Sequence, residues 1–415
     1  MNKHIYLIPL TFLFIISCTQ QPKEDIVKSN FQFAAEQLAL AMTETEKAIE
    51  NESPESKEKR EKRGHGPLVS PRSINEDGSL LIVPSRDWCS GFFPGELWYM
   101  YEYTKDAKWE EAARKYTARI EREKTNGTTH DMGFKVYCSF GNGYRLTKNE
   151  EYKKIMLEAA YTLITRYNPN IKAIRSWDHS SDKWECPVII DNMMNLELLF
   201  WAFKESNDST FYKIAVDHAR TTLKNHFRDD YSSYHVIDYD TISGQVLKKN
   251  THQGYSHESA WSRGQAWAVY GYTMCYRETR IPEFLEQAKQ VTNYIFTNPT
   301  LPGDLIPYWD YNAPGIPNEP RDVSAATVTA SALYELGLYD TVNAPKYTDW
   351  ANTILNNLSK NYLAQKGGDY GFLLLHSTGS VPGKFEVDKP LSYADYYFLE
   401  ALLRKQRLEQ TGQLF

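Results

Sequence analysis

Apolar residues recur at steps of three and four through most of the chain beyond residue 30. Leu157, Ala160, Ile164 and Tyr167 are one such series. A period near 3.6 places these side chains on one face of an α-helix. The pattern predicts twelve helices, at residues 30–50, 92–104, 107–124, 131–146, 149–167, 191–205, 209–226, 260–279, 282–296, 323–337, 345–360 and 391–405.

Short polar turns join many of these helices in pairs, such as Lys105 with Asp106 and Thr147 with Lys148. Helix pairs that recur without a strict sequence repeat are typical of a solenoid. A solenoid of six pairs that closes on itself is an (α/α)6 barrel. We therefore predict an all-α protein, in which residues 30–415 form a single barrel domain.

Residues 227–259 form the longest interruption of the helical pattern. Within them, 234–240 and 244–248 alternate around a turn of Ser and Gly, which predicts a small β-hairpin insertion near residues 231–250. Long ordered insertions often carry binding residues. The loops at 301–322 and 365–390, rich in Pro and Gly, are further candidates.

The first residues predict an export signal. Lys3 and His4 precede an apolar run at 5–16. That run is too short for a bilayer, which needs about 20 apolar residues, but it suits a secretory signal. Ser17 directly before Cys18 resembles the lipobox of bacterial lipoproteins, where the cysteine is acylated. A plain cleaved signal with an incidental cysteine is the alternative.

This interpretation divides the N-terminus into a signal peptide at 1–17 and a tether at 18–29 that follows the lipidated Cys18. We expect an exported protein, anchored by lipid in the bacterial envelope on its periplasmic or outer-membrane face. Glu24 and Asp25 favour the cell surface. The membrane is then a partner through the lipid only, and we expect a monomer or a weak homo-oligomer.

Charge and cysteine content exclude several classes of protein. The net charge of −6 and the lack of a basic patch argue against nucleic acid as a partner. Acids are interleaved in the charge run at 51–66, so we interpret it as a solvated helix end and loop. Cys89, Cys138, Cys186 and Cys275 are scattered without CxxC spacing, and they predict neither a metal site nor a disulfide framework.

Aromatic content favours a carbohydrate ligand. The chain has 29 Tyr and 10 Trp residues. Their rings combine a flat apolar face with a polar tip, as a sugar-binding cleft requires.

Two aspartates stand at predicted helix starts, Asp131 and Asp191. Taken singly, each is readily explained as a helix cap, since Asp is favoured there and the helix dipole stabilises its anion. In a closed barrel both could face one central cleft, where paired carboxylates cleave glycosidic linkages. A general acid needs a raised pKa, so burial and a second nearby carboxylate would have to outweigh the dipole.

The segment 259–270 places Arg263 between Trp261 and Trp267 near a helix start. Such a helix could offer aromatic faces to sugar rings and a guanidinium to a carboxylate. The alternative is a core helix with a buried, paired arginine.

Four motifs together resemble the unsaturated glucuronyl hydrolases of glycoside hydrolase family 88. They are WCSGFFPGELW at 88–98, HDMGF at 130–134, IDNMMN at 190–195 and WSRGQAW at 261–267. Each is moderately specific, but they occur in order and with compatible spacing. The resemblance implies an (α/α)6 barrel without metal or organic cofactor. It also implies hydration of the C4=C5 enol ether in a 4,5-unsaturated uronate at the non-reducing end of lyase-generated oligosaccharides.

The resemblance also assigns roles. Asp191 resembles the acid that protonates C4, and Asp131 its partner, which binds sugar hydroxyls and raises the pKa of Asp191. The implied substrate-binding residues are Trp88, Phe92, His130, Trp177, His235, Gln253, Trp261, Arg263, Trp267, Ser377, Ser380 and Lys384. Arg263 would face the uronate or a sulfate, and the loop from Ser377 to Lys384 would tune tolerance of sulfated substrates.

Two other functions compete with this prediction. An unsaturated rhamnogalacturonyl hydrolase would share the fold and the chemistry but act on pectin fragments; HDMGF favours the glucuronyl type. A non-catalytic surface lipoprotein that binds glycans would not need Asp131 and Asp191.

Overall fold

The computed structural model describes residues 25–414, so the predicted signal peptide and Cys18 lie outside the described part. Its helices are α1 (Ile26–Glu50), α2 (Pro54–Lys62), α3 (Phe92–Thr104), α4 (Ala107–Ala118), α5 (Asn142–Thr147), α6 (Glu150–Ile164), α7 (Asn192–Ser206), α8 (Ser209–Asn225), α9 (Ser262–Thr279), α10 (Pro282–Thr297), α11 (Val323–Leu336), α12 (Ala344–Asn361) and α13 (Ser392–Thr411). A π-helix, η3 (Gly133–Gly141), precedes α5, and three short 3-10 helices are η1 (Trp88–Gly91), η2 (Glu121–Thr125) and η4 (Asp369–Gly371). The twelve predicted helices are all present, with some displaced ends.

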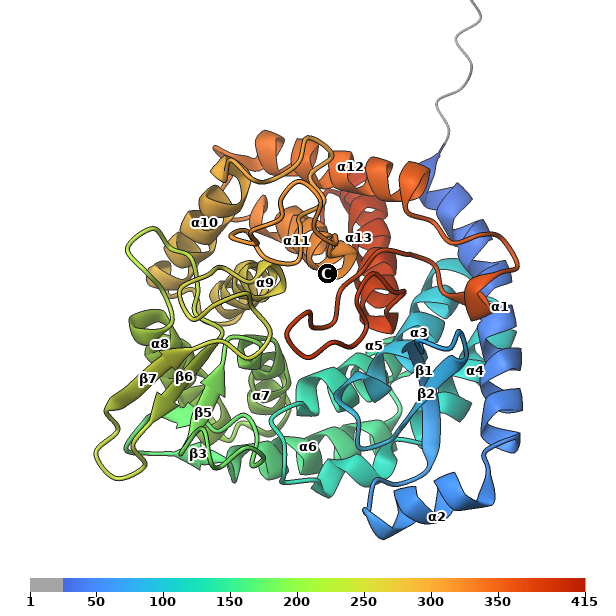
Figure 1. Ribbon diagram of the computed structural model, residues 1–415, viewed down its shortest axis with the longest axis horizontal. Helices are drawn as coiled ribbons and strands as arrows, with labels where there is room; N and C mark the ends of the chain where they lie inside the picture. Colours follow the sequence, from blue (N-terminus) through green and yellow to red (C-terminus); the bar gives the residue numbers. More distant parts are fainter. Residues whose placement is uncertain (1–24, 415) are drawn as a thin grey trace, which may run out of the picture.

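The helices alternate between an inner and an outer ring (Figure 1). The inner ring runs α3, η3 with α5, α7, α9, α11 and α13; each contacts the next, and α13 contacts α3. All residues of α11 are buried, whereas the outer helix α12 buries only one face. A helix that is apolar all round belongs inside a fold, and an amphipathic one covers it. This closed double ring confirms the predicted (α/α)6 barrel.

The helix predicted at 131–146 is divided. Its first part, η3, is a π-helix, and a regular α-helix follows from Asn142. Gly133 begins η3 where a Cβ atom would lie 2.6 Å from the Cα of Asn195 on α7. The missing side chain therefore lets η3 and α7 approach closely, and π-helical turns are frequent at functional sites.

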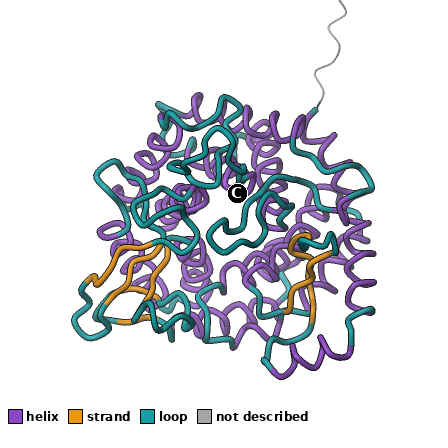
Figure 2. Tube along the Cα trace, viewed as in Figure 1, coloured by secondary structure: helices purple, strands orange, loops and turns teal. Residues whose placement is uncertain are grey.

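Strands form three small antiparallel sheets, at two edges of the ring in Figure 2. The predicted hairpin is present as β6 (Val236–Tyr239) and β7 (Val246–Asn250), but β5 (Pro187–Ile189) extends it to three strands. The sequence pattern did not predict β1 (Leu68–Ile74) with β2 (Leu80–Pro84), or β3 (Tyr167–Asn168) with β4 (Ala173–Ile174).

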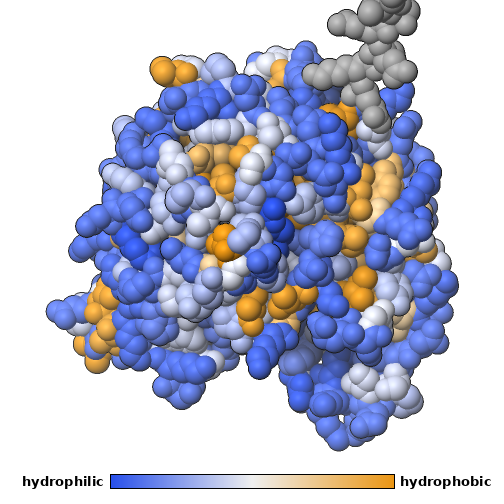
Figure 3. Space-filling model, turned by 45° about the horizontal axis from the view of Figure 1, so that its top comes forward, coloured by the Kyte–Doolittle hydropathy of each residue, from blue (hydrophilic) through white to orange (hydrophobic). Residues whose placement is uncertain are grey.

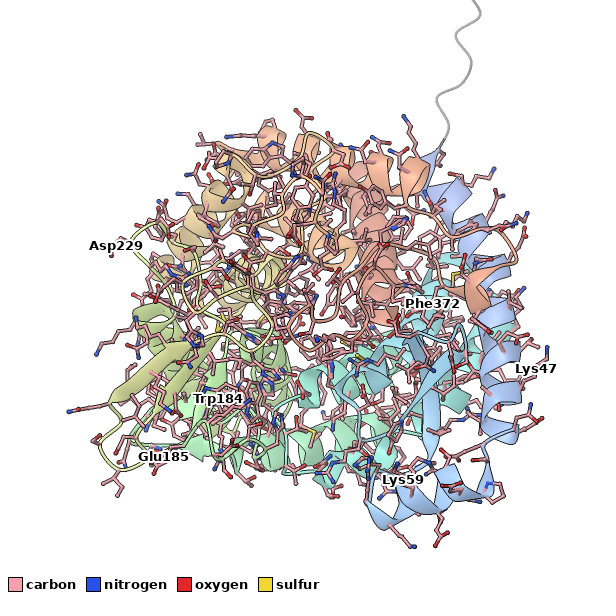
Figure 4. All side chains as sticks on the ribbon, viewed as in Figure 1. Lys47, Lys59, Trp184, Glu185, Asp229 and Phe372 are labelled. Carbon is pink, nitrogen blue, oxygen red and sulfur yellow. The ribbon has the colours of Figure 1, made fainter. Side chains whose placement is uncertain are left out.

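The N-terminal boundary needs a correction. The predicted tether extends to residue 29, but α1 begins at Ile26, capped by Asp25, whose side chain accepts two backbone N–H groups. The charge run expected as a helix end and loop contains the complete helix α2, which has no buried residue. Lys59 of α2 and Lys47 of α1 lie at the outer edge of the molecule (Figure 4).

Hydrophilic residues cover most of the surface in Figure 3, and hydrophobic residues gather in separate patches. Beneath it, one large hydrophobic core packs the two rings together. Cys89, Cys138, Cys186 and Cys275 are buried free thiols. Among residues 25–414, no helix combines the length and apolar character needed to cross a bilayer.

Candidate active site

A cavity of about 380 Å³ is lined by residues at the N-terminal ends of inner helices and by the loops before them. Both predicted acids, Asp131 and Asp191, line it. The other lining residues are Arg72, Arg86, Trp88, Thr128, Thr129, His130, Phe134, Ser176, Trp177, His179, Ile189, His252, Gln253, Arg263, Gly379, Phe385, Glu386 and Tyr393.

Asp191 directly precedes α7 but does not cap it. Its backbone is already helical, and its side chain accepts no hydrogen bond from the first turn of the helix. Asp208, at the start of α8, does accept one from the N–H of Thr210. Asp191 is 8% exposed, and its Oδ2 has no hydrogen-bond partner among the described residues. A buried carboxyl without a capping role is a candidate for chemistry.

Burial raises the pKa of Asp191 to about 6. His130 and Arg263 oppose this rise, and the carboxylate of Asp131 adds to it only weakly. Both expected causes act in the expected direction, and desolvation contributes more to the raised pKa than the like charge of Asp131 does. The resulting pKa suits a general acid at near-neutral pH.

Asp131 has the opposite environment. Its Oδ2 accepts a hydrogen bond from Thr129 Oγ1 at 2.5 Å, and its Oδ1 lies 3.1 Å from His130 Nε2. Burial opposes ionisation, but His130, Thr129 and Lys135 outweigh it and lower the pKa of Asp131 below its ordinary value. One carboxyl of the pair therefore stays ionised under conditions in which the other can hold a proton.

A direct link joins the elements that carry the two acids. The backbone N–H of Phe134, in η3, donates to Asn195 Oδ1, in α7, at 3.0 Å. Asn195 is fully buried, and Gly133 packs against its backbone. These contacts fix the position of Asp131 relative to Asp191.

His235 directly precedes the β6 strand. It is buried and is not among the lining residues of the cavity, and its Nε2 is 3.6 Å from Asp191 Oδ2. Its Nδ1 accepts hydrogen bonds from the backbone N–H groups of His252 and Gln253, both at 3.1 Å. The proton of the neutral ring is thereby assigned to Nε2, which faces the acid. Burial lowers the pKa of His235 well below its ordinary value, so the ring is neutral at physiological pH.

Arg263 lines the cavity, but its guanidinium is occupied. It donates to Asp322 Oδ2 at 2.5 Å and to the carbonyl oxygens of Thr378 and Gly379 at 2.6 and 2.8 Å. Arg263 is 1% exposed. The arginine therefore fixes the loop that contains Gly379, as the alternative of a buried, paired arginine anticipated.

The predicted aromatic wall is only partly present. Trp88 and Trp177 line the cavity, and Trp177 stacks on His179 with ring centroids 5.0 Å apart. Phe92, Trp261 and Trp267 are buried and are not among its lining residues. Their prediction as cleft residues is therefore wrong in this structure. Trp267 packs between Phe134 and Tyr397, and Trp261 packs on the ring of His235.

The loop between α12 and α13 reaches the cavity through other residues than expected. Gly379, Phe385 and Glu386 line it, whereas Ser377, Ser380 and Lys384 do not. Ser377 and Ser380 are buried within the loop, where they pair with Lys389 and Phe385. Gln253 lines the cavity as predicted and donates to the carbonyl oxygen of Gly379.

Several lining residues were absent from the predicted site, among them Arg72, Arg86, His179, Glu386 and Tyr393. Arg86 lies two residues before Trp88, so its proximity to a motif was an available signal. Arg72 binds Glu386 through two hydrogen bonds across 314 positions of sequence, which no local pattern could indicate.

A larger cavity, of about 590 Å³, is lined by later residues of the inner helices. Two of its arginines form a network of ion pairs: Arg277 with Glu197, Glu278 and Glu335, and Arg404 with Glu335 and Glu400. We interpret this network as structural. No group of three or more potential ligands that could hold a metal ion occurs within residues 25–414.

Comparison with known proteins identifies close relatives. The model of Glycosyl Hydrolase Family 88 matches residues 72–401. An unsaturated glucuronyl hydrolase of Formosa agariphila is 53% identical over 341 residues, which are 81% of this chain and 85% of the relative. The solved structure of an unsaturated glucuronyl hydrolase specific for heparin matches this protein with a TM-score of 0.85. The sequences of the two proteins are 44% identical, and the match covers 94% of this chain and 99% of the heparin-specific enzyme.

A third comparison is with a mutant unsaturated glucuronyl hydrolase of Streptococcus agalactiae, solved in complex with dGlcA-GalNAc6S. It is 27% identical, with a TM-score of 0.74, over 97% of this chain and 98% of the other. The family model covers most of the chain, and the Formosa agariphila protein is identical at more than half of the aligned positions. The chain therefore belongs to glycoside hydrolase family 88.

Proposed function

We propose that this protein is an unsaturated glucuronyl hydrolase that acts on oligosaccharides derived from glycosaminoglycans. The observation that carries the proposal is the pair of unlike carboxyl groups in one cavity. Asp191 has a pKa of about 6, and Asp131 has a pKa below its ordinary value. The heparin-specific relative and the relative bound to dGlcA-GalNAc6S support the choice of substrate class.

In the proposed reaction, protonated Asp191 transfers its proton to C4 of the unsaturated uronate. The electron pair of the C4=C5 bond forms the new C–H bond, and the ring oxygen stabilises the positive charge at C5. Water then adds at C5 and returns a proton to the Asp191 carboxylate. The hemiketal opens by cleavage of the bond between C5 and the ring oxygen. This leaves a hemiacetal at C1, which collapses and releases the neighbouring sugar.

The cavity supplies what these steps need. Asp191 lines the cavity, and its buried Oδ2 makes no hydrogen bond within the described residues, so its hydrogen-bonding capacity is left for a bound substrate or water. His235 offers its Nε2–H beside that oxygen and can orient the water or the carboxylate. Asp131, held ionised by His130 and Thr129, can accept hydrogen bonds from sugar hydroxyls. Its negative charge also stabilises the cationic character that develops in the ring.

The test is an assay with lyase-generated unsaturated disaccharides, followed by loss of the ultraviolet absorbance of the conjugated alkene. We expect the wild type to consume at least one disaccharide. Asp191→Asn should lose several orders of magnitude in rate while it keeps its circular dichroism spectrum. Asp208→Asn is the matched control, since it removes a carboxylate from the start of α8 without touching the cavity.

Two results would contradict the proposal. Turnover by Asp191→Asn at the wild-type rate would exclude Asp191 as the acid. Binding of the disaccharides without turnover by the wild type would instead indicate a glycan-binding protein.

We also propose that the protein is exported and lipid-anchored through Cys18. The lipobox-like sequence before it and the short apolar run at 5–16 support this proposal. Expression with a labelled fatty acid tests it. The wild type should carry the label in the membrane fraction, and Cys18→Ala should not; label on both proteins would refute the anchor.

A further inference from the structure

Three arginines line the catalytic cavity, and their charges are not equally compensated. Arg72 forms ion pairs with Asp87 and Glu386, and Arg263 forms one with Asp322. Arg86 is exposed and forms no ion pair with any residue in the described part of the chain. It therefore brings a positive charge to the cavity that no neighbouring carboxylate neutralises.

Arg86 is nevertheless held in place. Its Nη2 donates to Thr128 Oγ1 at 3.1 Å, and Thr128 Oγ1 donates in turn to Asn126 Oδ1 at 2.7 Å. Asn126 Nδ2 donates to Glu123 Oε2 at 2.7 Å, and Glu123 is buried. This chain uses one Nη2 hydrogen of Arg86 and leaves its other donors free for a ligand. A fixed guanidinium with free donors is well suited to a planar carboxylate or a sulfate.

Further charged groups lie around Arg86. His65 lies near Arg86, Arg63 and Arg60. Burial is the largest cause that lowers the pKa of His65, and the charges of the three arginines lower that pKa further. Arg60 is paired with Glu52, but no ion pair of Arg63 occurs within residues 25–414. None of His65, Arg63 and Arg60 lines the cavity, and the carboxylate of Asp87 opposes the effect of the arginines on His65.

The geometry also indicates which part of the substrate Arg86 can reach. The carboxylate of the reacting ring is bonded to C5, so it must lie next to the acid Asp191, which is buried. Arg86 is exposed and is linked to Thr128, next to Thr129, whose hydroxyl binds Asp131 rather than Asp191. A group at Arg86 thus belongs to another position of the substrate.

We propose that Arg86 is a specificity-determining residue that binds a second anionic group of the substrate, either a sulfate ester or the carboxylate of a following uronate. The inference rests on the proposed function. It assigns this selectivity to the loop between β2 and η1, outside the loop 377–384.

The experiment measures kcat/KM for unsaturated substrates that differ in one anionic group. They are an unsulfated disaccharide, the same disaccharide sulfated on the uronate, the same sulfated on the second sugar, and an unsulfated tetrasaccharide. Arg86→Ala should lower kcat/KM about tenfold or more for the substrates whose anion reaches residue 86, since a charge-assisted hydrogen bond is lost. For the unsulfated disaccharide, the change should stay within about twofold. The substrates that lose activity identify the anion as a sulfate or as a carboxylate.

Two further variants separate charge from position. Arg86→Lys keeps the charge but loses the planar pair of donors, so it should recover part of the selectivity. Thr128→Val keeps Arg86 but removes its anchor, and it should reduce selectivity in the same direction as Arg86→Ala. Arg220→Ala is the matched control, because it removes an exposed arginine of α8 outside the cavity.

The possible failures are distinct. Equal loss for all four substrates with Arg86→Ala, or loss for none, would overturn the role of Arg86 and leave the proposed function standing. Failure of the wild type to consume any of the four would overturn the proposed function and this inference together.

Discussion

The buried carboxyl of Asp191 lowers the free energy of unfolding of the protein at neutral pH. In the unfolded chain its carboxyl titrates near its ordinary pKa of about 3.9. In the fold, burial raises the pKa to about 6. Below pH 3.9 the group is protonated in both states and costs nothing. Between pH 3.9 and about 6 the unfolded chain is ionised while the buried carboxyl still holds its proton, so the free energy of unfolding falls across this interval by roughly 2 to 4 kcal/mol, and above pH 6 the loss is complete.

Asparagine cannot ionise, so Asp191→Asn should be more stable than the wild type at pH 7 to 8. The gain in the free energy of unfolding should be roughly 2 to 4 kcal/mol, and it should disappear near pH 4. Denaturant unfolding at several pH values measures it. Asp208→Asn is the control: its carboxylate caps α8 and has a lowered pKa, so that variant should lose stability at neutral pH. A gain for Asp191→Asn that does not change with pH would contradict the explanation.

The same pKa governs the rate. If the protonated form of Asp191 is the catalyst, kcat/KM should fall as pH rises above about 6. Asp131→Asn should reduce the rate severely, because it loses the carboxylate that accepts from sugar hydroxyls. It should move the alkaline limb to lower pH by less than about one unit, since burial contributes more to the pKa of Asp191 than the charge of Asp131 does. A profile of kcat/KM against pH checks this, and a shift of two units or more would restore Asp131 as the main cause.

For single residues, the sequence predicted which residue types could form the active site, but not which side chains point into the cavity. Asp191 and Asp208 both stand at helix starts, and only coordinates distinguish the free carboxyl from the cap. Trp88 and Trp267 both fit an aromatic cleft, yet only Trp88 reaches it. For Arg263, the partner Asp322 lies 59 positions away, so its pairing was not evident from its own segment.

Among the elements, η3 and α7 begin just after the two acids, and a buried hydrogen bond joins them. Asn195→Leu keeps the approximate volume of the side chain but leaves the N–H of Phe134 without its acceptor. The variant should lose about 1 to 3 kcal/mol in the free energy of unfolding. Because Asp131 moves relative to Asp191, kcat should fall more than KM rises. Unfolding curves and steady-state kinetics measure the two effects.

Asn142→Leu provides the control for that variant. Asn142, beyond the far end of η3, also makes buried hydrogen bonds, to the carbonyl oxygen of Cys138 and to Tyr396. It should lose comparable stability with little change in kcat. Equal kinetic losses for both variants would show that general destabilisation, rather than the alignment of the acids, causes the effect.

Helices with a strong apolar period were predicted well, and α3 has the predicted bounds, 92–104. The π-helix was missed because a single widened stretch leaves the apolar period nearly unchanged. The β1 and β2 strands were missed because they are short and their pairing includes register shifts, so no regular alternation marks them. The closed ring was predictable from helix number, but the loops that complete the cavity were not.

At the scale of the molecule, the ion pair of Arg72 with Glu386 joins β1 to the loop before α13. Its side chains are 14% and 6% exposed, so the pair is shielded from water. Glu386→Gln should lower the free energy of unfolding by about 1 to 3 kcal/mol, because Arg72 loses part of its charge compensation. It should also raise KM, since the loop forms part of the cavity.

Glu76→Gln is the control, because it removes an ion pair that is exposed to water. Its partner Lys389 follows Glu386 closely, but the Glu76 side chain is 76% exposed. Removing so exposed a pair should change stability by less than about 1 kcal/mol and leave KM unchanged. Thermal unfolding and steady-state kinetics of Glu386→Gln and Glu76→Gln measure these effects. Equal losses of stability in the two variants would contradict the prediction that the buried ion pair contributes more than the exposed one.

The contact between α13 and α3 closes the inner ring, and it has a consequence for the biogenesis of the protein. The α3 helix is synthesised long before α13, which is the last helix among residues 25–414. Until then α3 and α11 lack the neighbour that both of them contact. Contacts of such long sequence separation form late in folding. The ring, and with it the catalytic cavity, can therefore be complete only after α13 has been made, so a chain that terminates before α13 lacks the activity of the full protein.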